Sequence, residues 1–225
     1  METRFFDRLV SIPLFQGLSN DDFMNIASRV HFDFRTLSPG STIVEAGVAC
    51  EHLICSINGE ISKELRSDNG NYRFREYYTQ PTIMQPERLF GLRPRFSATF
   101  TAETEAQVLM IPKNEVRDIL FDHVPFHINY LNHLCSDRHL WESRLFHHLP
   151  ETLTQQFLHF ILLRSTRPAG KKELITEMVH FANELCVTRL RLSNLLHELS
   201  DQGLVELRRR HILIPSLEKL IQYAQ

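Results

Sequence analysis

The chain has 225 residues, of which 43% are hydrophobic, 10% aromatic and 23% charged. This composition is typical of a folded globular protein, and the length predicts one or two domains. The formal net charge of −2 argues against a wholly basic nucleic-acid-binding protein. The charge is unevenly divided, because residues 1–149 carry 15 basic and 19 acidic residues whereas residues 150–225 carry 10 and 8.

Targeting and redox features are also informative. No apolar run approaches the roughly 18 residues of a transmembrane helix, and the charges within residues 1–15 interrupt any signal-peptide core. We therefore expect a cytoplasmic protein without a membrane partner. The four cysteines contain no C-x-x-C pair, so free thiols are expected rather than a zinc ribbon, a thioredoxin-like site or an iron–sulfur cluster.

The first half of the chain changes from a helical to a strand pattern. Ser19 is a good N-cap for a short amphipathic helix, with Asp22 at its positive end. From about residue 31 to residue 111, short β-branched and aromatic runs alternate with turn residues. The expected strands include residues 42–44, 52–57, 72–78 and 99–111. Such short strands at regular spacing predict a β-sandwich or barrel.

Helical spacing returns after this region. Helices are expected over residues 113–120, 125–149 and 152–164. The long middle helix carries one apolar stripe at spacings of three and four, which favours packing along a partner helix in a dimer. An ordinary amphipathic core helix is the alternative. The residues assigned to the dimer helix are Ile128, Leu131, Leu134, Cys135, Trp141 and Leu145.

The C-terminal pattern is the most specific. A helix over residues 177–185, a break at 186–188 and a helix over 189–202 precede two short strands, and a basic tip at 208–211 separates those strands. This order predicts a winged helix–turn–helix, whose second helix fits the DNA major groove and whose wing contacts phosphates. A generic helix pair with a solvated charge run is the alternative. The predicted DNA-binding residues are Thr188, Arg189, Leu190, Arg191, Asn194, His197, Arg208, Arg209 and Arg210.

With these motifs in order, the chain resembles the CRP/FNR superfamily of bacterial transcription regulators. The resemblance rests on residues 13–19, 38–47, 53–60 and 188–205. It implies an α+β fold with a double-stranded β-helix sensor domain, which is jelly-roll-like and cyclic-nucleotide-binding-like, at residues 1–120. A dimerisation helix at 121–149 and a winged helix–turn–helix at 150–225 would follow. It also implies a homodimer on a pseudo-palindromic double-stranded DNA site, with RNA polymerase as a further candidate partner.

The resemblance also implies a site for a small effector, and here the sequence departs from the family pattern. Gly91 is present, but Leu92 stands where a ribose-binding Glu is expected and Phe96 where a phosphate-binding Arg is expected. Because a phosphate without its bidentate arginine loses its main contact, cyclic AMP and cyclic GMP are not expected as ligands. The effector is therefore unidentified, and its predicted pocket residues are Gly91, Leu92, Arg93, Arg95 and Ser97.

Haem binding, metal binding and catalysis are the alternatives to a DNA-binding regulator. Six histidines lie on or near the long helix, at positions 123, 127, 133, 139, 147 and 148, and haem ligation is an alternative to ordinary surface histidines. We expect no metal, no cofactor and no enzyme activity, since no His-x-His pair, phosphate loop or activated serine is present. The prediction is a sequence-specific regulator; the alternative is a degenerate sensor that acts as a protein-interaction module with constitutive or weak DNA binding.

Overall fold

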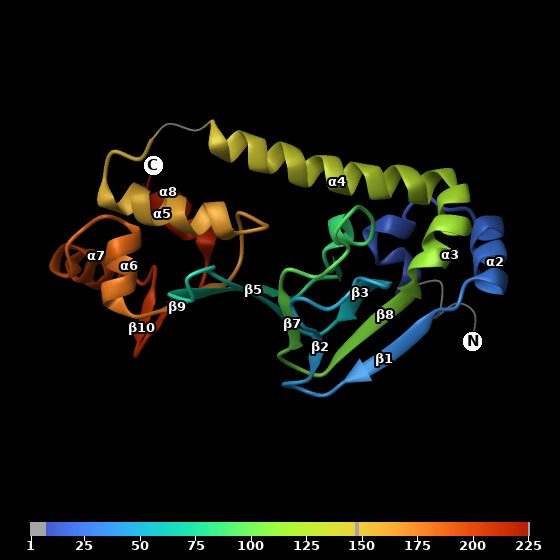
Figure 1. Ribbon diagram of the computed structural model, residues 1–225, viewed down its shortest axis with the longest axis horizontal. Coiled ribbons are helices and arrows are strands. Elements are labelled where there is room, and N and C mark those ends of the chain that lie inside the picture. The colour runs from blue at the N-terminus through green and yellow to red at the C-terminus, as the bar shows by residue number, and fades with distance from the viewer. Residues whose placement is uncertain (1–7, 147–148, 225) are drawn as a thin grey trace. The chain divides into compact units, whose positions relative to one another are not determined.

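The computed structural model describes residues 8–146 and 149–224 (Figure 1). The chain divides into two compact units. Unit 1 comprises residues 1–62 and 78–139, and unit 2 comprises residues 63–77 and 140–225. Both units combine helices and strands, which confirms the α+β class. Within the described ranges, no helix is both long enough and apolar enough to cross a bilayer.

Unit 1 begins with η1 (Pro13–Phe15) and α2 (Asn20–Arg29). The predicted start of α2 is confirmed, because the Ser19 hydroxyl accepts from the Asp22 backbone N–H and the Asp22 carboxylate accepts from the Ser19 backbone N–H. The Ser19 hydroxyl and backbone lower the pKa of Asp22 to about 2, with a smaller contribution from His123. A carboxylate at this end of the helix also complements the helix dipole.

The strands of unit 1 form a roll. Four strands lie in the order β1-β8-β3-β6, and β2 pairs with β7. Their bounds are β1 (Asp33–Leu37), β2 (Thr42–Val44), β3 (His52–Asn58), β6 (Thr82–Ile83), β7 (Thr99–Ala102) and β8 (Ala106–Pro112). The single strand expected over 99–111 is wrong, since a turn separates β7 from β8. The backbone N–H groups of Glu103 and Thr104 both point to the Glu60 carbonyl there, at 2.8 and 3.4 Å.

Short helices and one tight turn complete unit 1. They are η2 (Pro86–Arg88), α3 (Lys113–Asp118) and η3 (Leu120–Asp122). Gly59 lies between β3 and the next strand with a φ of 84°. A Cβ there would lie 2.6 Å from the Glu105 carbonyl oxygen, so the turn accepts only glycine without rearrangement.

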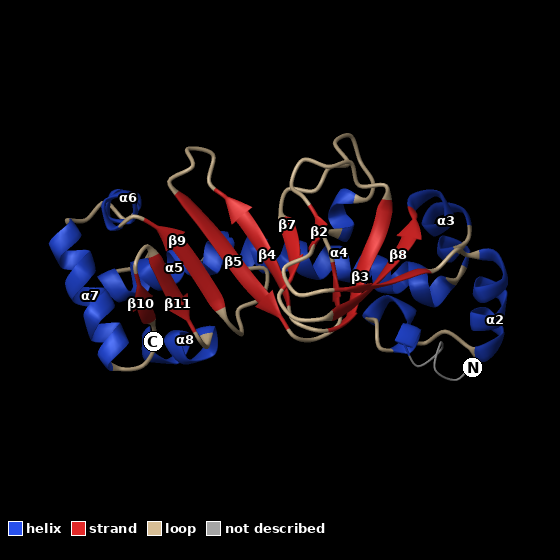
Figure 2. Ribbon diagram, turned by 90° about the horizontal axis from the view of Figure 1, so that it is seen from below, coloured by secondary structure: helices blue, strands red, loops and turns tan. Residues whose placement is uncertain are grey.

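Unit 2 is built on a second antiparallel arrangement (Figure 2). Its strands lie in the order β10-β11-β9-β5-β4. They are β4 (Ile61–Arg66), β5 (Tyr72–Tyr78), β9 (Lys172–Thr176), β10 (Glu206–Arg208) and β11 (His211–Ile214). β5 and β9 pair over five residues, from Tyr72 opposite Thr176 to Glu76 opposite Lys172. The segment 63–77, nearly 100 residues upstream of β9, is therefore part of the same sheet as the predicted wing.

Four helices pack on this sheet. They are α5 (Leu153–Arg164), α6 (Met178–Glu184), α7 (Arg189–Asp201) and α8 (Leu217–Ala224). The core draws on helices and strands alike, and its fully buried members include Phe74, Phe157, Phe181, Leu196 and Ile214. Phe74 comes from β5, which shows that the 63–77 hairpin contributes to the core of unit 2 as well as to its sheet.

The long helix is α4 (Val124–Leu145). It ends at Leu145, so the prediction that helix continues to Leu149 is wrong. Pro150 disfavours a helical conformation for the residue before it, which is consistent with an earlier end. Pro125 lies in the first turn of α4, where its missing N–H costs no helical hydrogen bond.

A buried ion pair fixes the end of the β5–β9 ladder. The Lys172 ammonium lies 3.0 Å from a Glu76 carboxylate oxygen, and both side chains are 1% exposed. The backbone N–H of Thr166 donates to both oxygens of Glu76, at 2.8 and 2.9 Å. Burial alone would raise the pKa of Glu76, but Lys172, Lys63 and Thr166 together hold it below its usual range. The carboxylate is therefore ionised and fully engaged.

Replacing Lys172 by Met should test this pair. The change leaves Glu76 buried without its nearest cation, so the free energy of unfolding should fall by about 3 kcal/mol or more. Adding Glu76→Gln to Lys172→Met should recover part of the loss. Urea denaturation followed by circular dichroism measures both effects, with Lys219→Met on the exposed face of α8 as the control. Equal losses for Lys172→Met and Lys219→Met would contradict the assigned role.

Candidate nucleic-acid interface

The predicted order of helix, turn, helix and hairpin in unit 2 is confirmed. α6 ends at Glu184 and α7 begins at Arg189. The Thr188 hydroxyl accepts a hydrogen bond from the Arg191 backbone N–H at 3.3 Å, so Thr188 is the N-cap. Cys186 adopts a left-handed φ of 53° in the turn between the helices, a conformation that L-residues disfavour.

The two sides of α7 differ sharply in burial. Leu192, Leu195, Leu196 and Leu199 pack into the core of unit 2. The opposite side faces solvent, and Leu190 is 70% exposed there. All nine residues predicted to contact DNA are exposed, namely Thr188, Arg189, Leu190, Arg191, Asn194, His197, Arg208, Arg209 and Arg210. Exposure makes contact with DNA feasible, and the role itself stays a prediction.

The arginines of the wing differ in their partners. β10 and β11 pair as far as Arg208 opposite His211, so Arg209 and Arg210 form the turn. The Arg208 guanidinium lies 3.3 Å from Glu206, and that of Arg210 lies 2.6 Å from Glu177. Arg209 makes no ion pair with any residue that the structure describes. Arg209 is therefore the wing arginine that does not share its charge with a described carboxylate, while Arg208 and Arg210 are also largely exposed.

The base of the wing is fixed by a charged network on the outer face of the sheet. Glu173 accepts a hydrogen bond from the Tyr77 hydroxyl at 2.8 Å and contacts His211 Nδ1 at 2.7 Å and Arg75 Nη1 at 3.4 Å. Burial opposes ionisation of Glu173, but His211, Tyr77 and Arg75 outweigh it and lower its pKa. Arg75 also contacts Glu64 of β4 at 2.6 Å. The network therefore joins β4, β5, β9 and β11 across one face.

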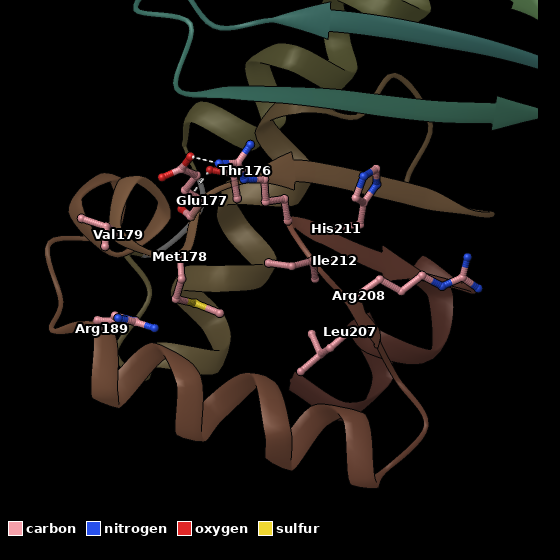
Figure 3. Close-up of a pocket in the computed structure, with 10 residues that line it drawn as sticks. Thr176, Glu177, Met178, Val179, Arg189, Leu207, Arg208, His211 and Ile212 are labelled. Atoms are coloured by element: carbon pink, nitrogen blue, oxygen red, sulfur yellow. Dashed lines mark hydrogen bonds and ion pairs between the residues drawn. The ribbon is translucent and has the colours of Figure 1, made fainter.

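A hollow of about 330 Å³ lies between α6, the start of α7 and the wing. Figure 3 shows Met178 pointing into it from α6, Leu207 approaching from β10 and Arg189 standing at the first turn of α7. The lining combines apolar side chains with Arg189, Arg208 and Arg210. The Glu177 carboxylate also lines the hollow and pairs with Arg210, so the lining carries charges of both signs around its apolar side chains.

The helix predicted to form a dimer presents an apolar row. Ile128 is 49% and Leu131 is 44% exposed, and Val124 and Leu145 are more exposed still. Cys135 lies four residues after Leu131 and continues the row. Leu134 beside it is half-buried. Trp141 is 44% exposed. The guanidinium carbon of Arg144 lies over its ring, 5.8 Å from the ring centroid. Most of this row is exposed among the described residues, and its role in a dimer stays a prediction.

All five residues predicted to bind an effector are exposed, and their role stays a prediction. Gly91, Leu92 and Arg93 are exposed, and Arg95 donates to the Gly47 carbonyl at 2.9 Å. A hollow of about 390 Å³ in unit 1 lies elsewhere, along residues 42–54, with Phe96 and Met110. Ser97 is instead bonded to Gln85, which the sequence reasoning missed. The sequence signal that could have pointed to Gln85 was a polar residue directly after the run Thr82–Met84, which is buried.

Histidines and thiols offer no clear metal chemistry in the described ranges. No group of three or more His, Cys, Asp or Glu side chains there is arranged to hold a metal ion. His147 and His148 lie outside the described residues. His123 contacts Asp22 at 3.0 Å, and His127 stacks on Phe121. Burial raises the pKa of Cys50 to about 11 and that of Cys55 to about 12, so neither is a reactive thiol.

Comparison with known proteins supports the fold. Residues 34–123 match the family model of the cyclic nucleotide-binding domain. No curated protein sequence is matched. Among solved structures, a protein of Eubacterium rectale described as a CRP/FNR-family transcriptional regulator matches with a TM-score of 0.53 and 21% identity. That match covers 95% of this chain and 98% of the other.

Two further structures are similar. The c-di-GMP-responsive global regulator CLP of Xanthomonas campestris gives a TM-score of 0.51 at 15% identity, over 88% of this chain and 99% of that one. The sensor domain of the transcriptional regulator DNR of Pseudomonas aeruginosa gives 0.50 at 20% identity, over 68% and 99%. These identities establish a shared fold, and each ligand named belongs to the relative.

The strained turn between α6 and α7 generates a stability prediction. Replacing Cys186 by Gly should make the protein more stable than replacing it by Ala, by about 1 kcal/mol, because only glycine adopts φ near 53° without a steric penalty. Thermal unfolding of the two variants measures the difference. A Cys186→Ala variant at least as stable as Cys186→Gly would show that the left-handed conformation carries no cost.

Proposed function

We propose that this chain, whose residues 34–123 belong to the cyclic nucleotide-binding domain family and which has the CRP/FNR fold, is a dimeric, sequence-specific DNA-binding regulator of that type. The observation that carries the proposal is the combination in unit 2 of an exposed Arg189 at the first turn of α7 with an exposed Arg209 at the wing tip, which has no ion pair with a described residue. One is suited to base edges and the other to phosphates.

Residues near the start of α7 have complementary chemistry for base reading. An arginine binds guanine through two hydrogen bonds, an asparagine binds adenine in the same way, and a leucine contacts the thymine methyl group. Arg189, Asn194 and Leu190 supply these three groups from the exposed side of the helix. We propose that they read a half-site in the major groove, with Thr188, Arg191 and His197 beside them.

Phosphate contacts would fix the register of the helix. Each phosphate neutralised by a basic side chain releases counterions and makes binding weaker at higher salt. Arg208 and Arg210 already have carboxylate partners, so Arg209 should contribute the largest share from the wing. The small positive excess of residues 150–225 predicts modest non-specific affinity. Specific binding should then depend on base contacts and on two half-sites.

The α4 row supports the dimer. Burying Ile128, Leu131 and Leu145 against a second copy would remove exposed apolar surface from water. A two-fold dimer would place two copies of α7 on half-sites of a pseudo-palindromic duplex about one helical turn apart. A cytoplasmic regulator of this kind would also meet RNA polymerase. Neither a haem nor another cofactor enters the proposal, and no reaction is assigned to the chain.

The alternative is a degenerate sensor that acts as a protein-interaction module, in a chain whose DNA binding is constitutive or weak. The absence of a carboxylate at Leu92 and of an arginine at Phe96 favours a sensor that does not bind cyclic nucleotides. The two readings share the DNA interface. They differ in whether a small effector changes the population that binds DNA.

Arg189→Ala tests the DNA reading directly. The full-length protein first selects preferred duplexes from a random library, and affinities are then measured over a series of salt concentrations. Arg189→Ala should reduce discrimination at one position of each half-site by about 1–3 kcal/mol. Arg209→Ala is the matched control and should weaken preferred and random duplexes alike, lowering the salt slope by about 0.9 per lost contact. An unchanged sequence preference in Arg189→Ala would refute base reading by α7.

Leu131→Lys tests the dimer. Its charge would be buried twice in a two-fold seam, so the dimer dissociation constant should rise by about a hundredfold or more. Sedimentation velocity measures the change, and palindromic DNA binding should weaken with it. Ser136→Lys, on an exposed position of α4 away from the row, is the control. A Leu131→Lys protein that remains as dimeric as Ser136→Lys would place the interface elsewhere.

A further inference from the structure

Glu177 is an acidic residue on the face of unit 2 that we propose for DNA. It directly precedes α6, in the N-cap position, but its side chain makes no capping hydrogen bond. Its Oε1 instead lies 2.6 Å from the Arg210 guanidinium at the wing turn, and its Oε2 lies 3.9 Å from His180 Nε2. A capping side chain accepts from the backbone of its own helix. The Glu177 carboxylate is directed to the wing instead (Figure 3).

The wing turn is held by contacts other than this ion pair. The Arg210 carbonyl accepts a hydrogen bond from the Thr176 backbone N–H at 2.9 Å, which ties the turn to β9. The pairing of β10 with β11 extends to Arg208 opposite His211, at the edge of the turn. The side chains of Arg210 and Glu177 are 62% and 49% exposed, and ion pairs between such exposed groups contribute little to stability. Bracing of the turn therefore does not explain the pair.

The surroundings of the pair are basic. The hollow of about 330 Å³ beside it is lined by Arg189, Arg208 and Arg210, and Glu177 supplies the only carboxylate among its described lining residues. Glu206 lies beside Arg208 but outside this lining. A guanidinium binds a carboxylate and a phosphate through the same kind of charge-assisted hydrogen bond. A DNA phosphate that approached Arg210 would consequently meet an anion already bound there in the same way.

We propose that Glu177 competes with DNA phosphates for Arg210 and thereby limits how tightly the chain binds any duplex. In the free protein the carboxylate holds the guanidinium, and on DNA a phosphate takes its place. The affinity gained from Arg210 is reduced by the loss of the ion pair and by repulsion between the two anions.

This competition acts most clearly on DNA without the preferred sequence. A non-specific duplex offers mainly its phosphates, so a competitor for a phosphate-binding arginine keeps its affinity low. A preferred site adds base contacts, which Glu177 does not oppose. The inference rests on the proposed function and deepens it, because it assigns to Glu177 the control of affinity at the same interface.

Other roles of Glu177 predict different outcomes. If Glu177 served to position Arg210 for DNA, removal of its charge would weaken binding. If Glu177 competes with phosphate, the same change frees Arg210 and strengthens binding. A carboxylate that only repelled DNA would also strengthen binding when removed, but it would do so whether or not an arginine stood at position 210. Substitutions at positions 177 and 210 therefore separate the three roles.

Glu177→Gln in the full-length protein is the first test, because glutamine keeps the size of the side chain and removes its charge. Affinity for preferred and random duplexes should rise about threefold to fivefold, and the salt slope should steepen by up to about 0.9 per protomer as Arg210 gains a phosphate. Fluorescence anisotropy of labelled duplexes over a salt series measures both values, and circular dichroism checks the fold. Glu105→Gln, at an exposed position of unit 1, is the control for net charge and should change neither value.

The decisive comparison places Glu177→Gln in an Arg210→Gln background. The gain should disappear there, since no guanidinium is left to release, and the salt slopes of Arg210→Gln and of the double variant should coincide. A gain that persists in this background would overturn the inference in favour of direct repulsion, and weaker binding by Glu177→Gln alone would overturn it in favour of a positioning role. Wild-type protein that binds no duplex would refute the proposed function, and this inference with it, whereas the first two results leave the proposed function intact.

Discussion

The pairing of β5 with β9 is the interaction on which unit 2 depends. It joins segments about 100 residues apart, and the cost of closing so long a loop must be offset by what the contact buries. Phe74 on the inner face and the Glu76–Lys172 pair at the end of the ladder supply that stabilisation. On the outer face, Glu173 binds Tyr77 and His211, so the same strand holds the wing in register with β5. The position of the wing arginines therefore follows from residues far upstream.

The arginines of the candidate interface fall into two groups: those that lie beside a carboxylate and those for which no such partner is described. Glu206 and Glu177 lie beside Arg208 and Arg210 and reduce the net positive charge near the wing tip. Arg189 and Arg209 are left to act outward. With so little net positive charge, the DNA binding that we propose would gain its selectivity from the shape and hydrogen-bonding groups of α7. A slightly acidic chain can in this way present the face that we propose for DNA.

Local patterns predicted the helices, the caps and the wing well, because Ser19, Thr188 and the leucines of α7 act on neighbours within a few residues. β9 was missed because Lys172 and Glu173 resemble a polar loop. Their burial depends on partners in β5, which no local window contains. The contact between Gln85 and Ser97 was not predicted for the same reason, since the two residues lie twelve positions apart. The predicted effector residues near Gly91 are exposed, and their role stays a prediction.

The composition of the sheet in unit 2 also bears on how this protein can be dissected. A fragment that starts at residue 150 would retain β9, β10 and β11 but lose β4 and β5. β9 would become a free edge with unpaired N–H and C=O groups, and Lys172 would lose its carboxylate. Exposed edges of this kind promote self-association. A fragment intended to fold alone would have to carry the 63–77 hairpin with it, joined by a linker, and recombinant truncation at residue 150 should yield aggregates.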